Sequence, residues 1–356
     1  MDLDKYYIST KTRRMLSTSD GIILLRDNKL IRCIPNDVPL EDKGDYILDK
    51  SSYSEEEVYS QIPYHHMYCE VSELHFCVGK ESNVHFVIGD IRDKERLSRA
   101  MENIDYVVHA AALKQVDTAE YNPDEYIKTN ILGSMNIVDA SLENKIKKVI
   151  ALSTDKACSP VNLYGATKLC SEKTFLAANN IKGNRNISFS VVRYGNVAGS
   201  RGSIIPKILE LKKKNIKDFN LTHKEATRFW ITLEDSVEMI MWAIKNCNEG
   251  QLLIPKIPSF KILDLIKVLY PETKINLVGL RPGEKIHEDL VSSNETNVYD
   301  IGKYYSIYPS YVVLKSKNKM KKLEENFMMN SGTYHQRLNK KQLIKKISNN
   351  IKNFNF

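Results

Sequence analysis

The stretch IDYVVHAAALKQVDTAEYNPDEYIKTNILGSMNIVDASLENKIKKVIALST, residues 104–154, decides the fold class of this chain. It begins with an apolar run that ends in small residues and closes on a second apolar run. Between them lies a long segment of helical spacing that opens at Asn122 and Pro123. A helix between two short buried strands is typical of a βαβ unit, so the stretch predicts an α/β protein with parallel strands.

The same alternation continues on both sides of this stretch. We expect a strand at VHFVIGD (84–90) and a helix at KERLSRAMEN (94–103). A helix at YGATKLCSEKTFLAANN (164–180) and a strand at ISFSVVRYGNV (187–197) follow. The pattern predicts a Rossmann-like, doubly wound parallel sheet, whose ligands bind at the carboxyl ends of the strands.

The beginning of the chain departs from that plan. A dinucleotide-binding sheet opens with a strand and a glycine-rich loop, but before Gly89 the sequence has glycine only at 21, 44 and 79, too far apart to form it. Instead, DGIILLRDNKLIRCIP (20–35) is typical of a β-hairpin with Asp27 and Asn28 at the turn. We therefore predict that the first βαβ unit is replaced. Residues 15–35 either supply the missing central strand or leave the sheet open on that side.

Four regions follow from these patterns. We predict an atypical N-terminal segment at 1–83, a Rossmann-like core at 84–200 to which later segments return, a smaller α/β substrate lobe at 201–310, and a basic C-terminal tail with a helix at 311–356.

Composition narrows the class of protein. No apolar run approaches the roughly 20 residues of a membrane span, and the N-terminus lacks the hydrophobic region of a signal peptide, so we expect a cytoplasmic protein without a span. The net charge is +8, but its lysine-rich segments resemble solvated helix faces and no nucleic-acid-binding motif accompanies them. A basic opening for an anionic small molecule explains the charge more simply.

The six cysteines are scattered, which favours reduced thiols. A cluster within HHMYCEVSELHFC could gather around zinc, but no ligand pair has a Cys-x-x-Cys partner elsewhere, and we expect no metal site. The residues of that cluster are His65, His66, Cys69, His75 and Cys77.

The residues with the clearest chemistry lie in STDKACSPVNLYGATK, 153–168. Tyr164 and Lys168 are four residues apart, so on a helix they share a face, and the ammonium can lower the pKa of the phenol. Such a pair also occurs by chance in structural helices. Thr154, at the end of the preceding strand, makes a functional pair the better interpretation. The adjacent Asp155 and Lys156 are read either as an added acid and base or as an exposed loop pair.

With these residues the chain resembles the inverting UDP-N-acetylglucosamine 4,6-dehydratases, which are polysaccharide biosynthesis proteins of the extended short-chain dehydrogenase/reductase superfamily. The similarity covers roughly residues 85–310 and leaves the N-terminal quarter uncovered. The matching segments are GDIRDKERL, DYVVHAAALKQVDTAEYNPDEYIKTNILGSMNIVDA, VIALSTDKACSPVNLYGATKLCSEKTFLAANN, SFSVVRYGNVAGSRGSIIP, TRFWITLED, IPKIPSFKILDL and LRPGEKIHE.

The resemblance implies a lyase that uses NADP, or NAD, on a UDP-sugar. Tyr164 takes the C4 hydroxyl proton as hydride leaves C4, with Thr154 and Lys168 in support. Lys156 then removes the C5 proton, now next to a ketone, and Asp155 protonates the departing C6 hydroxyl. Hydride returns to C6, and reprotonation of C5 from the opposite face gives the inverted 4-keto-6-deoxy sugar.

The resemblance also implies binding residues and a homo-oligomer. Beside Tyr164 and Lys168, the cofactor would be bound by Asp90, Ile91, Ala110, Ala111, Ala112, Lys114, Val197, Ala198, Gly199, Ser200 and Arg201. The sugar nucleotide would be bound by Lys114, Asn196, Thr222, Arg281 and Glu284. No nucleic acid is implied as a partner.

Three departures from the family pattern leave a second function open. Gln115 and Asp117 stand where the family has histidine and proline, and His223–Ala226 replaces a stretch that usually begins with aspartate and ends in methionine. The absent glycine loop matters more, because its backbone N–H groups hold the pyrophosphate. The alternative is a catalytically impaired sugar-nucleotide-binding relic, or a partner of an intact homologue. A metal- or nucleic-acid-binding module at 1–83 has only the histidine and cysteine cluster in its favour.

Overall fold

The computed structural model describes residues 5–9, 22–26, 29–33, 87–200, 203–248, 250–312 and 320–350. The five residues considered as zinc ligands, and Arg201, lie outside these ranges. The chain divides into two compact units, Met1–Leu152 with Lys173–Ser190, and Ser153–Glu172 with Val191–Phe356.

The βαβ unit that the sequence predicts forms the centre of the first unit. Strands β4 (Tyr106–His109) and β5 (Lys148–Thr154) pair in parallel, with Tyr106 opposite Lys148. The connection contains α4 (Val116–Tyr121), α5 (Pro123–Tyr126), the π-helical turn η2 (Ile127–Leu132) and α6 (Gly133–Glu143). Pro123 occupies the first helical turn, where the missing N–H costs nothing, so the predicted helix start is confirmed.

The hairpin at 20–35 is also confirmed, but it does not fill the place beside β4. Strands β2 (Ile22–Arg26) and β3 (Lys29–Cys33) pair in antiparallel fashion on either side of residues 27 and 28. Strand β1 (Lys5–Ser9) pairs in parallel with β4 and antiparallel with β2. The strand order in the first unit is therefore β6-β5-β4-β1-β2-β3, and residues 5–9 supply the neighbour of β4.

The strand expected at 84–90 is wrong for the residues that are described. Val87–Asp90 run without regular structure into a turn, where the Asp93 N–H donates to the Asp90 carbonyl (2.9 Å). The Ile88 carbonyl accepts from the Arg96 side chain (2.5 Å) rather than from a neighbouring strand. The antiparallel hairpin already occupies the edge beyond β1, so this segment has no parallel strand there to pair with. Helix α3 (Lys94–Ala100) follows.

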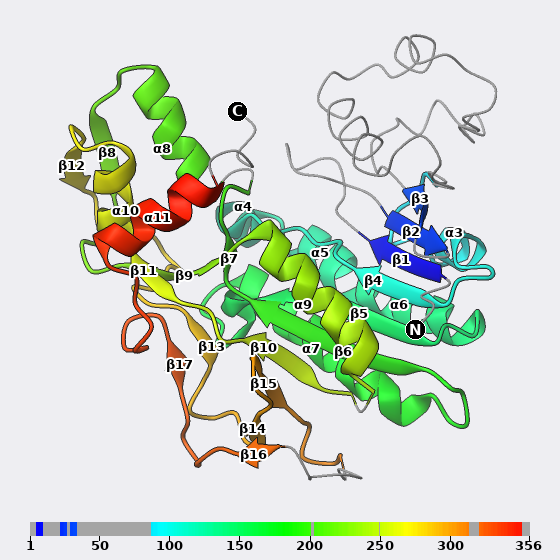
Figure 1. The fold of residues 1–356 in the computed structure, drawn as a ribbon. Coiled ribbons are helices and arrows are strands. Elements are labelled where there is room, and N and C mark those ends of the chain that lie inside the picture. The colour runs from blue at the N-terminus through cyan, green and yellow to red at the C-terminus, as the bar shows by residue number, and fades with distance from the viewer. Residues whose placement is uncertain are drawn as a thin grey trace, which may run out of the picture. The chain divides into compact units, whose positions relative to one another are not determined.

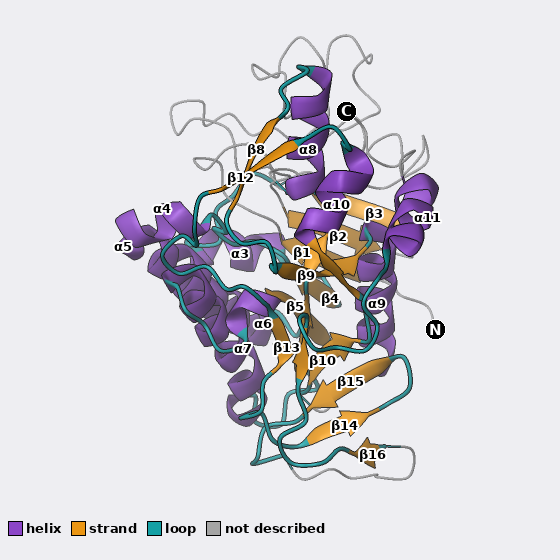
Figure 2. Cartoon of the chain, turned by 90° about the vertical axis from the view of Figure 1, so that its left-hand side faces the viewer, coloured by secondary structure: helices purple, strands orange, loops and turns teal. Residues whose placement is uncertain are grey.

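In the second unit, β6 (Ser188–Tyr194) continues into a run of paired strands. It pairs in parallel with β10 (Leu252–Pro255), which pairs antiparallel with β15 (Tyr304–Ile307). Strands β14 (Val298–Asp300) and β16 (Lys321–Lys322) extend the run, and Figure 2 shows β10, β15 and β14 side by side. Helix α7 (Leu163–Ile181) connects β5 to β6.

The second unit also contains a hydrophobic cluster between short strands and helices. Trp230 and Phe260 meet edge to face, with ring centroids 5.6 Å apart, at its centre. Figure 1 shows α8 and α10 beside β8 and β12, and α11 packs against α10. The elements around the cluster are β7 (Asn196–Val197), α8 (Ile204–Lys213), β8 (Asp218–Leu221), β9 (Thr227–Ile231), β11 (Ser259–Lys261), α10 (Ile262–Leu269), β12 (Lys274–Leu277) and α11 (Lys340–Asn350). Strands β13 (Asp289–Val291) and β17 (Met329–Asn330) pair separately.

Helix α9 (Leu233–Asn246) begins with a capping box at Thr232. The Thr232 hydroxyl oxygen accepts from the Asp235 N–H (3.0 Å), and the Asp235 carboxylate accepts from the Thr232 N–H (3.3 Å). Both interactions satisfy N–H groups that a helix start leaves without a partner in the helix.

Thr232→Ala removes the hydroxyl acceptor, and we expect it to lower the free energy of unfolding by about 1 kcal/mol. Thr232→Ser keeps the hydroxyl and serves as the matched control. Urea denaturation followed by circular dichroism measures both, and equal midpoints for the two variants would contradict the assigned cap.

A buried cation ties three segments of the second unit together. Arg193, on β6, is 1% exposed and donates from Nε and Nη2 to the two carboxylate oxygens of Glu172 (2.9 and 2.7 Å). Its Nη1 contacts Glu295 (2.8 Å) and donates to the Leu290 carbonyl (3.0 Å). Because Glu172 lies on α7, this paired guanidinium connects the strand, the helix and the segment after β13.

Arg193→Met leaves the two carboxylates in place without their cation. Removing one partner of a buried ion pair costs about 3–5 kcal/mol, and we expect a loss of that size in the free energy of unfolding. Arg185→Met, at an exposed arginine, is the control, with an expected change within about 0.5 kcal/mol. Urea unfolding that found the two variants equally stable would show that the pair does not hold these segments.

Candidate active site

The turn after β5 brings Thr154, Asp155 and Lys156 together. Residues Asp155–Ala157 form the short 3-10 turn η3, and the Thr154 hydroxyl donates to Asp155 Oδ1 (2.9 Å). The same hydroxyl oxygen accepts from the Lys156 N–H (3.4 Å). Asp155 is 1% exposed, and its Oδ2 has no hydrogen-bond partner among the described residues.

The first turn of α7 packs directly on that turn. A Cβ at Gly165 would lie 2.2 Å from the Lys156 carbonyl oxygen, so only glycine allows the approach. Asn162 caps the helix, because its side-chain oxygen accepts from the Gly165 N–H (2.8 Å). Tyr164 and Lys168, which the sequence places on one face, are both buried in this part of α7. The two halves of STDKACSPVNLYGATK are therefore neighbours in space.

The two lysines of this region are perturbed in opposite directions. Burial lowers the pKa of Lys168 to about 8, although the charge of Glu172 opposes the shift. Burial alone would also lower the pKa of Lys156, but the carboxylates of Asp155 and Glu288 outweigh it and raise this pKa above its usual value. Lys168 is thus the lysine that readily loses its proton, and Lys156 is the lysine that retains it.

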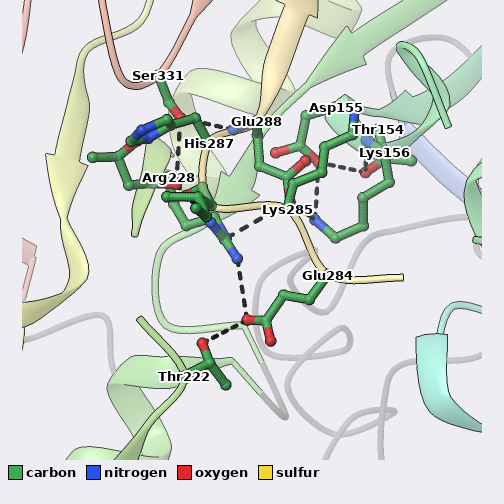
Figure 3. A network of polar contacts seen from close by, with 12 residues as sticks. Thr154, Asp155, Lys156, Thr222, Arg228, Glu284, Lys285, His287, Glu288 and Ser331 are labelled. Carbon is green, nitrogen blue, oxygen red and sulfur yellow. Dashed lines mark hydrogen bonds and ion pairs between the residues drawn. The ribbon is translucent and has the colours of Figure 1, made fainter. Parts of the chain in front are cut away.

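Lys156 lies between carboxylates from two different segments, as Figure 3 shows. Its Nζ is 3.1 Å from Asp155 Oδ1 and 3.4 Å from Glu288 Oε1. Glu288 is 3% exposed and also faces Arg228, whose Nε is 3.7 Å from Glu288 Oε1. The amine is therefore held by a charged network rather than lying free in a loop.

Two other predicted sugar-nucleotide residues contact Glu284 in the same network, and Figure 3 shows Thr222 and Arg228 beside its carboxylate. The Thr222 hydroxyl donates to Glu284 Oε1 (2.9 Å), and Arg281 Nε is 3.3 Å from Glu284 Oε2. Arg228 also approaches Glu284, with Nη2 3.5 Å from Oε1. The side chain of Arg281 is 59% exposed, so its guanidinium can reach an added anion.

The loop RPGEK that carries Arg281 and Glu284 is attached to the start of α7. Gly283 has a φ of +72°, a conformation that favours glycine, and the Asn162 amide donates to its carbonyl (2.8 Å). Asn162 therefore positions both the helix of Tyr164 and this loop.

The predicted cofactor residues after β6 form a tight turn. Val197 is in β7, the Ala198 N–H donates to the Ile231 carbonyl (2.8 Å), and the Ser200 N–H donates to the Val197 carbonyl (3.2 Å). Gly199 has a φ of +77°. Asn196, predicted to bind the sugar nucleotide, is exposed on β7.

The remaining predicted residues belong to the first unit. Asp90 lies in the turn before α3, where its carboxylate pairs with Arg92 (2.7 Å), and Ile91 is fully buried. The small residues predicted beneath the cofactor follow β4, with Ala111 and Ala112 buried and Ala110 partly exposed. Lys114, also partly exposed, comes two residues later.

The departures from the family pattern have local roles. Gln115 precedes α4, and its carbonyl accepts from the Tyr126 hydroxyl (2.5 Å), while Asp117 lies in the first turn of that helix. The substituted stretch at 223–226 forms the turn before β9, where Glu225 pairs with Lys261 (2.8 Å). Both are compatible with the surrounding fold.

Sequence reasoning missed Asn162, Arg228 and Glu288 as parts of this site. All three lie inside segments that carry the resemblance, and Asn162 also has the residue type and position of a helix cap. Glu288 contacts Lys156, Arg228 contacts Glu288, and Asn162 contacts Gly283. These contacts join segments far apart in the chain, which local patterns do not reveal. Within the described residues there is no cluster of metal-ligating side chains, and none of the helices is long and apolar enough to cross a membrane.

Comparisons with known proteins identify the family of this chain. Residues 54–309 match the model of the family described as "Polysaccharide biosynthesis protein". The chain is 54% identical over 226 residues to an inverting UDP-N-acetylglucosamine 4,6-dehydratase of Campylobacter jejuni subsp. jejuni serotype O:2, covering 63% of this chain and 68% of that protein.

Two solved structures have the same fold. The X-ray structure of Pen from Bacillus thuringiensis is 34% identical with a TM-score of 0.73, covering 80% of this chain and 87% of the other. DesIV from Streptomyces venezuelae, a dTDP-glucose 4,6-dehydratase crystallised with NAD and TYD bound, has a TM-score of 0.54 over 59% of this chain and 72% of its own; at 20% identity it supports the fold alone. The Rossmann-like α/β fold predicted from the sequence is confirmed, and this chain belongs to the polysaccharide biosynthesis protein family.

Proposed function

We propose that this chain is an inverting sugar-nucleotide 4,6-dehydratase that converts UDP-N-acetylglucosamine to the C5-inverted 4-keto-6-deoxy sugar for surface glycan biosynthesis. The observation that carries the proposal is the packing of the turn Asp155–Ala157 against the Tyr164 end of α7, with Gly165 allowing the contact. The packing supports the proposal because the proposed acid and base for elimination then lie near the tyrosine and lysine proposed for proton transfer at an alcohol. The match with a named dehydratase supports the same reaction.

Oxidation at C4 depends on Tyr164 as the base for the hydroxyl proton. When bound, the nicotinamide dinucleotide supplies the hydride acceptor and donor. Lys168 is buried beside the tyrosine in α7, and its ammonium form stabilises the phenolate. Since burial lowers the pKa of Lys168 to about 8, this support weakens as pH rises above that value.

Elimination depends on Lys156 and Asp155. The resting pair is an ammonium and a carboxylate 3.1 Å apart, so transfer of one proton from Lys156 to Asp155 gives a neutral amine and a carboxylic acid. The amine then takes the C5 proton while the acid protonates the C6 oxygen, which departs as water. This step returns Lys156 to the ammonium and Asp155 to the carboxylate, so the pair recovers its starting protonation state.

Residues of the chain fit the nicotinamide end of a dinucleotide. Buried Tyr164 and Lys168 suit the ribose hydroxyls, and the small side chains of Ala110, Ala111 and Ala112 after β4 allow close approach to the backbone. We propose that the remaining cofactor contacts come from Asp90, Ile91, Lys114 and residues 197–201. The proposed cofactor is NADP, and NAD is the alternative.

The sugar nucleotide is proposed to bind at the Glu284 network. The exposed guanidinium of Arg281 suits the diphosphate, and Glu284 suits sugar or ribose hydroxyls, with Thr222 alongside. Asn196 and Lys114 complete the proposed set. Assembly as a homo-oligomer and a cytoplasmic location remain predictions.

The alternative of a catalytically impaired relic is not favoured. Its main support is the lack of a glycine-rich loop, whereas the similarity to a named dehydratase extends over most of the chain that carries the proposed chemistry. A direct reaction assay separates the two functions.

The test is to incubate the full chain with UDP-N-acetylglucosamine and either NADP or NAD, and to follow loss of water by mass spectrometry and the C5 configuration by NMR. We expect the inverted 4-keto-6-deoxy product. Lys156→Ala should slow elimination by about 10²–10⁴-fold, the usual contribution of a positioned general base. Tyr164→Phe should instead block the initial oxidation, seen as loss of the reduced-cofactor absorbance in a single turnover.

Lys173→Ala is the control, because Lys173 is an exposed lysine on α7. It should react like the unmodified chain. No product with either cofactor, together with no dinucleotide binding in calorimetry, would refute the active-enzyme proposal and leave the relic in its place.

A further inference from the structure

Glu288 is a buried carboxylate with no role in the proposed chemistry so far. Its backbone is fixed just before β13, because its N–H donates to the Ser331 hydroxyl (2.9 Å) and its carbonyl accepts from the Ser331 N–H (2.8 Å). The residue is 3% exposed. A charged group this buried is costly unless nearby charges compensate it.

The compensating charges are those of the elimination site. Glu288 Oε1 lies 3.4 Å from Lys156 Nζ and 3.7 Å from Arg228 Nε. Glu288 Oε2 is buried and has no hydrogen-bond partner among the described residues. Lys156, Arg228 and Arg281 contribute three positive charges to this network, and Asp155, Glu284 and an ionised Glu288 contribute three negative ones.

We propose that Glu288 is a positioning residue of the elimination step, a second counter-charge that holds the Lys156 amine beside Asp155 and sets how readily that amine gives up its proton. This inference rests on the proposed dehydratase function. Asp155 comes from the same turn as Lys156 and moves with it, whereas Glu288 holds the amine from a separate segment.

The charges facing Lys156 come from four segments. Asp155 and Glu288 favour its ammonium form, as does the Tyr164 phenol on α7, and Arg228 on β9 disfavours it. Without the carboxylate of Glu288, Asp155 is the one remaining carboxylate of this pair, and the positive charge of Arg228 offsets more of its effect on Lys156. The ammonium is then less stable, and the amine becomes neutral at a lower pH.

The first test reads Lys156 directly and uses neither cofactor nor substrate. The full chain is labelled briefly with acetic anhydride across a pH series, and acetylation of Lys156 is quantified by mass spectrometry. Because only a neutral amine reacts, we expect Glu288→Gln to move the midpoint of labelling to lower pH by about one unit or more, the usual effect of an opposite charge at this distance.

Asp289→Asn is the matched control from the adjacent position. Asp289 faces Lys285 (3.7 Å) and accepts from the Asn330 amide (2.7 Å), with no contact to Lys156 among its described interactions. Its labelling midpoint for Lys156 should equal that of the unmodified chain. A Glu288→Gln midpoint that also stayed in place would overturn the role of Glu288.

The second test separates the two halves of the reaction. In Glu288→Gln the neutral amine of Lys156 forms more readily, but the amine is no longer held from a second segment, and we expect the loss of positioning to outweigh the gain. Formation of reduced cofactor in a single turnover should be unchanged, while loss of water slows by about tenfold or more, as for other residues that orient a reacting group. Glu288→Asp keeps the negative charge but places it farther from Lys156, because the side chain is one methylene shorter. It should therefore restore the labelling midpoint of Lys156 more fully than the rate of water loss. Equal slowing of oxidation and elimination would indicate a structural role and refute the proposal.

The two tests also separate failure of the proposed dehydratase function from failure of the role of Glu288. If the unmodified chain forms no dehydrated product, the proposed function fails whatever the labelling shows. If it forms product but Glu288→Gln matches it in both labelling and water loss, the function stands and the role of Glu288 fails. Should Glu288→Gln not fold, Glu288→Asp decides alone: slowed elimination with intact oxidation supports the role, and unchanged rates refute it.

Discussion

The candidate site depends on the buried pairing of Arg193 with Glu172 and Glu295. Arg193 is on β6, Glu172 is one turn beyond Lys168 on α7, and Glu295 follows β13, so one guanidinium fixes the helix of the tyrosine and lysine against two other segments. Buried charges seldom add much stability compared with an apolar core, but they strongly penalise arrangements that leave one of them unpaired. The pairing therefore specifies position more than it adds stability, which is what a site built from separate segments requires.

Burial and charge together give the two lysines different chemistry. Both are taken out of water, which by itself favours the neutral amine. For Lys168 the charge of Glu172 opposes this effect, but Glu172 is also paired with Arg193, and burial lowers the pKa of Lys168 to about 8. Lys156 has two carboxylates within 3.4 Å, and its pKa is raised. Because this pKa is raised, Lys156 begins as an ammonium ion beside Asp155. Its proposed use as a base therefore requires the proton transfer from Lys156 to Asp155.

Local patterns in the sequence predicted the parts whose causes are local. The helix start at Pro123, the hairpin around residues 27 and 28, and the shared face of Tyr164 and Lys168 follow from nearest-neighbour geometry. The prediction of a strand at 84–90 is wrong for residues 87–90. A strand needs a free sheet edge to pair with, and the hairpin occupies the edge beyond β1. Arg228 and Glu288 were missed for a similar reason: each is near Lys156 only through the fold, 60 or more positions along the chain. The division into four regions stays a prediction.

The stretch at 153–168 shows how backbone shape limits the choice of chemistry. Its proposed acid and base are on a turn, and its tyrosine and lysine are on a helix. The turn and the helix can meet only if a residue at the helix start has no side chain. Gly165 meets this condition. The carboxamide of Asn162 then accepts a hydrogen bond from the helix and donates one to the loop of Arg281 and Glu284. A polar side chain with two donors and one acceptor can join two segments in this way, whereas an aspartate there could cap the helix but could not donate to the Gly283 carbonyl. The contact between turn and helix therefore constrains Asn162 and Gly165 as strongly as the chemistry constrains Lys156 and Tyr164.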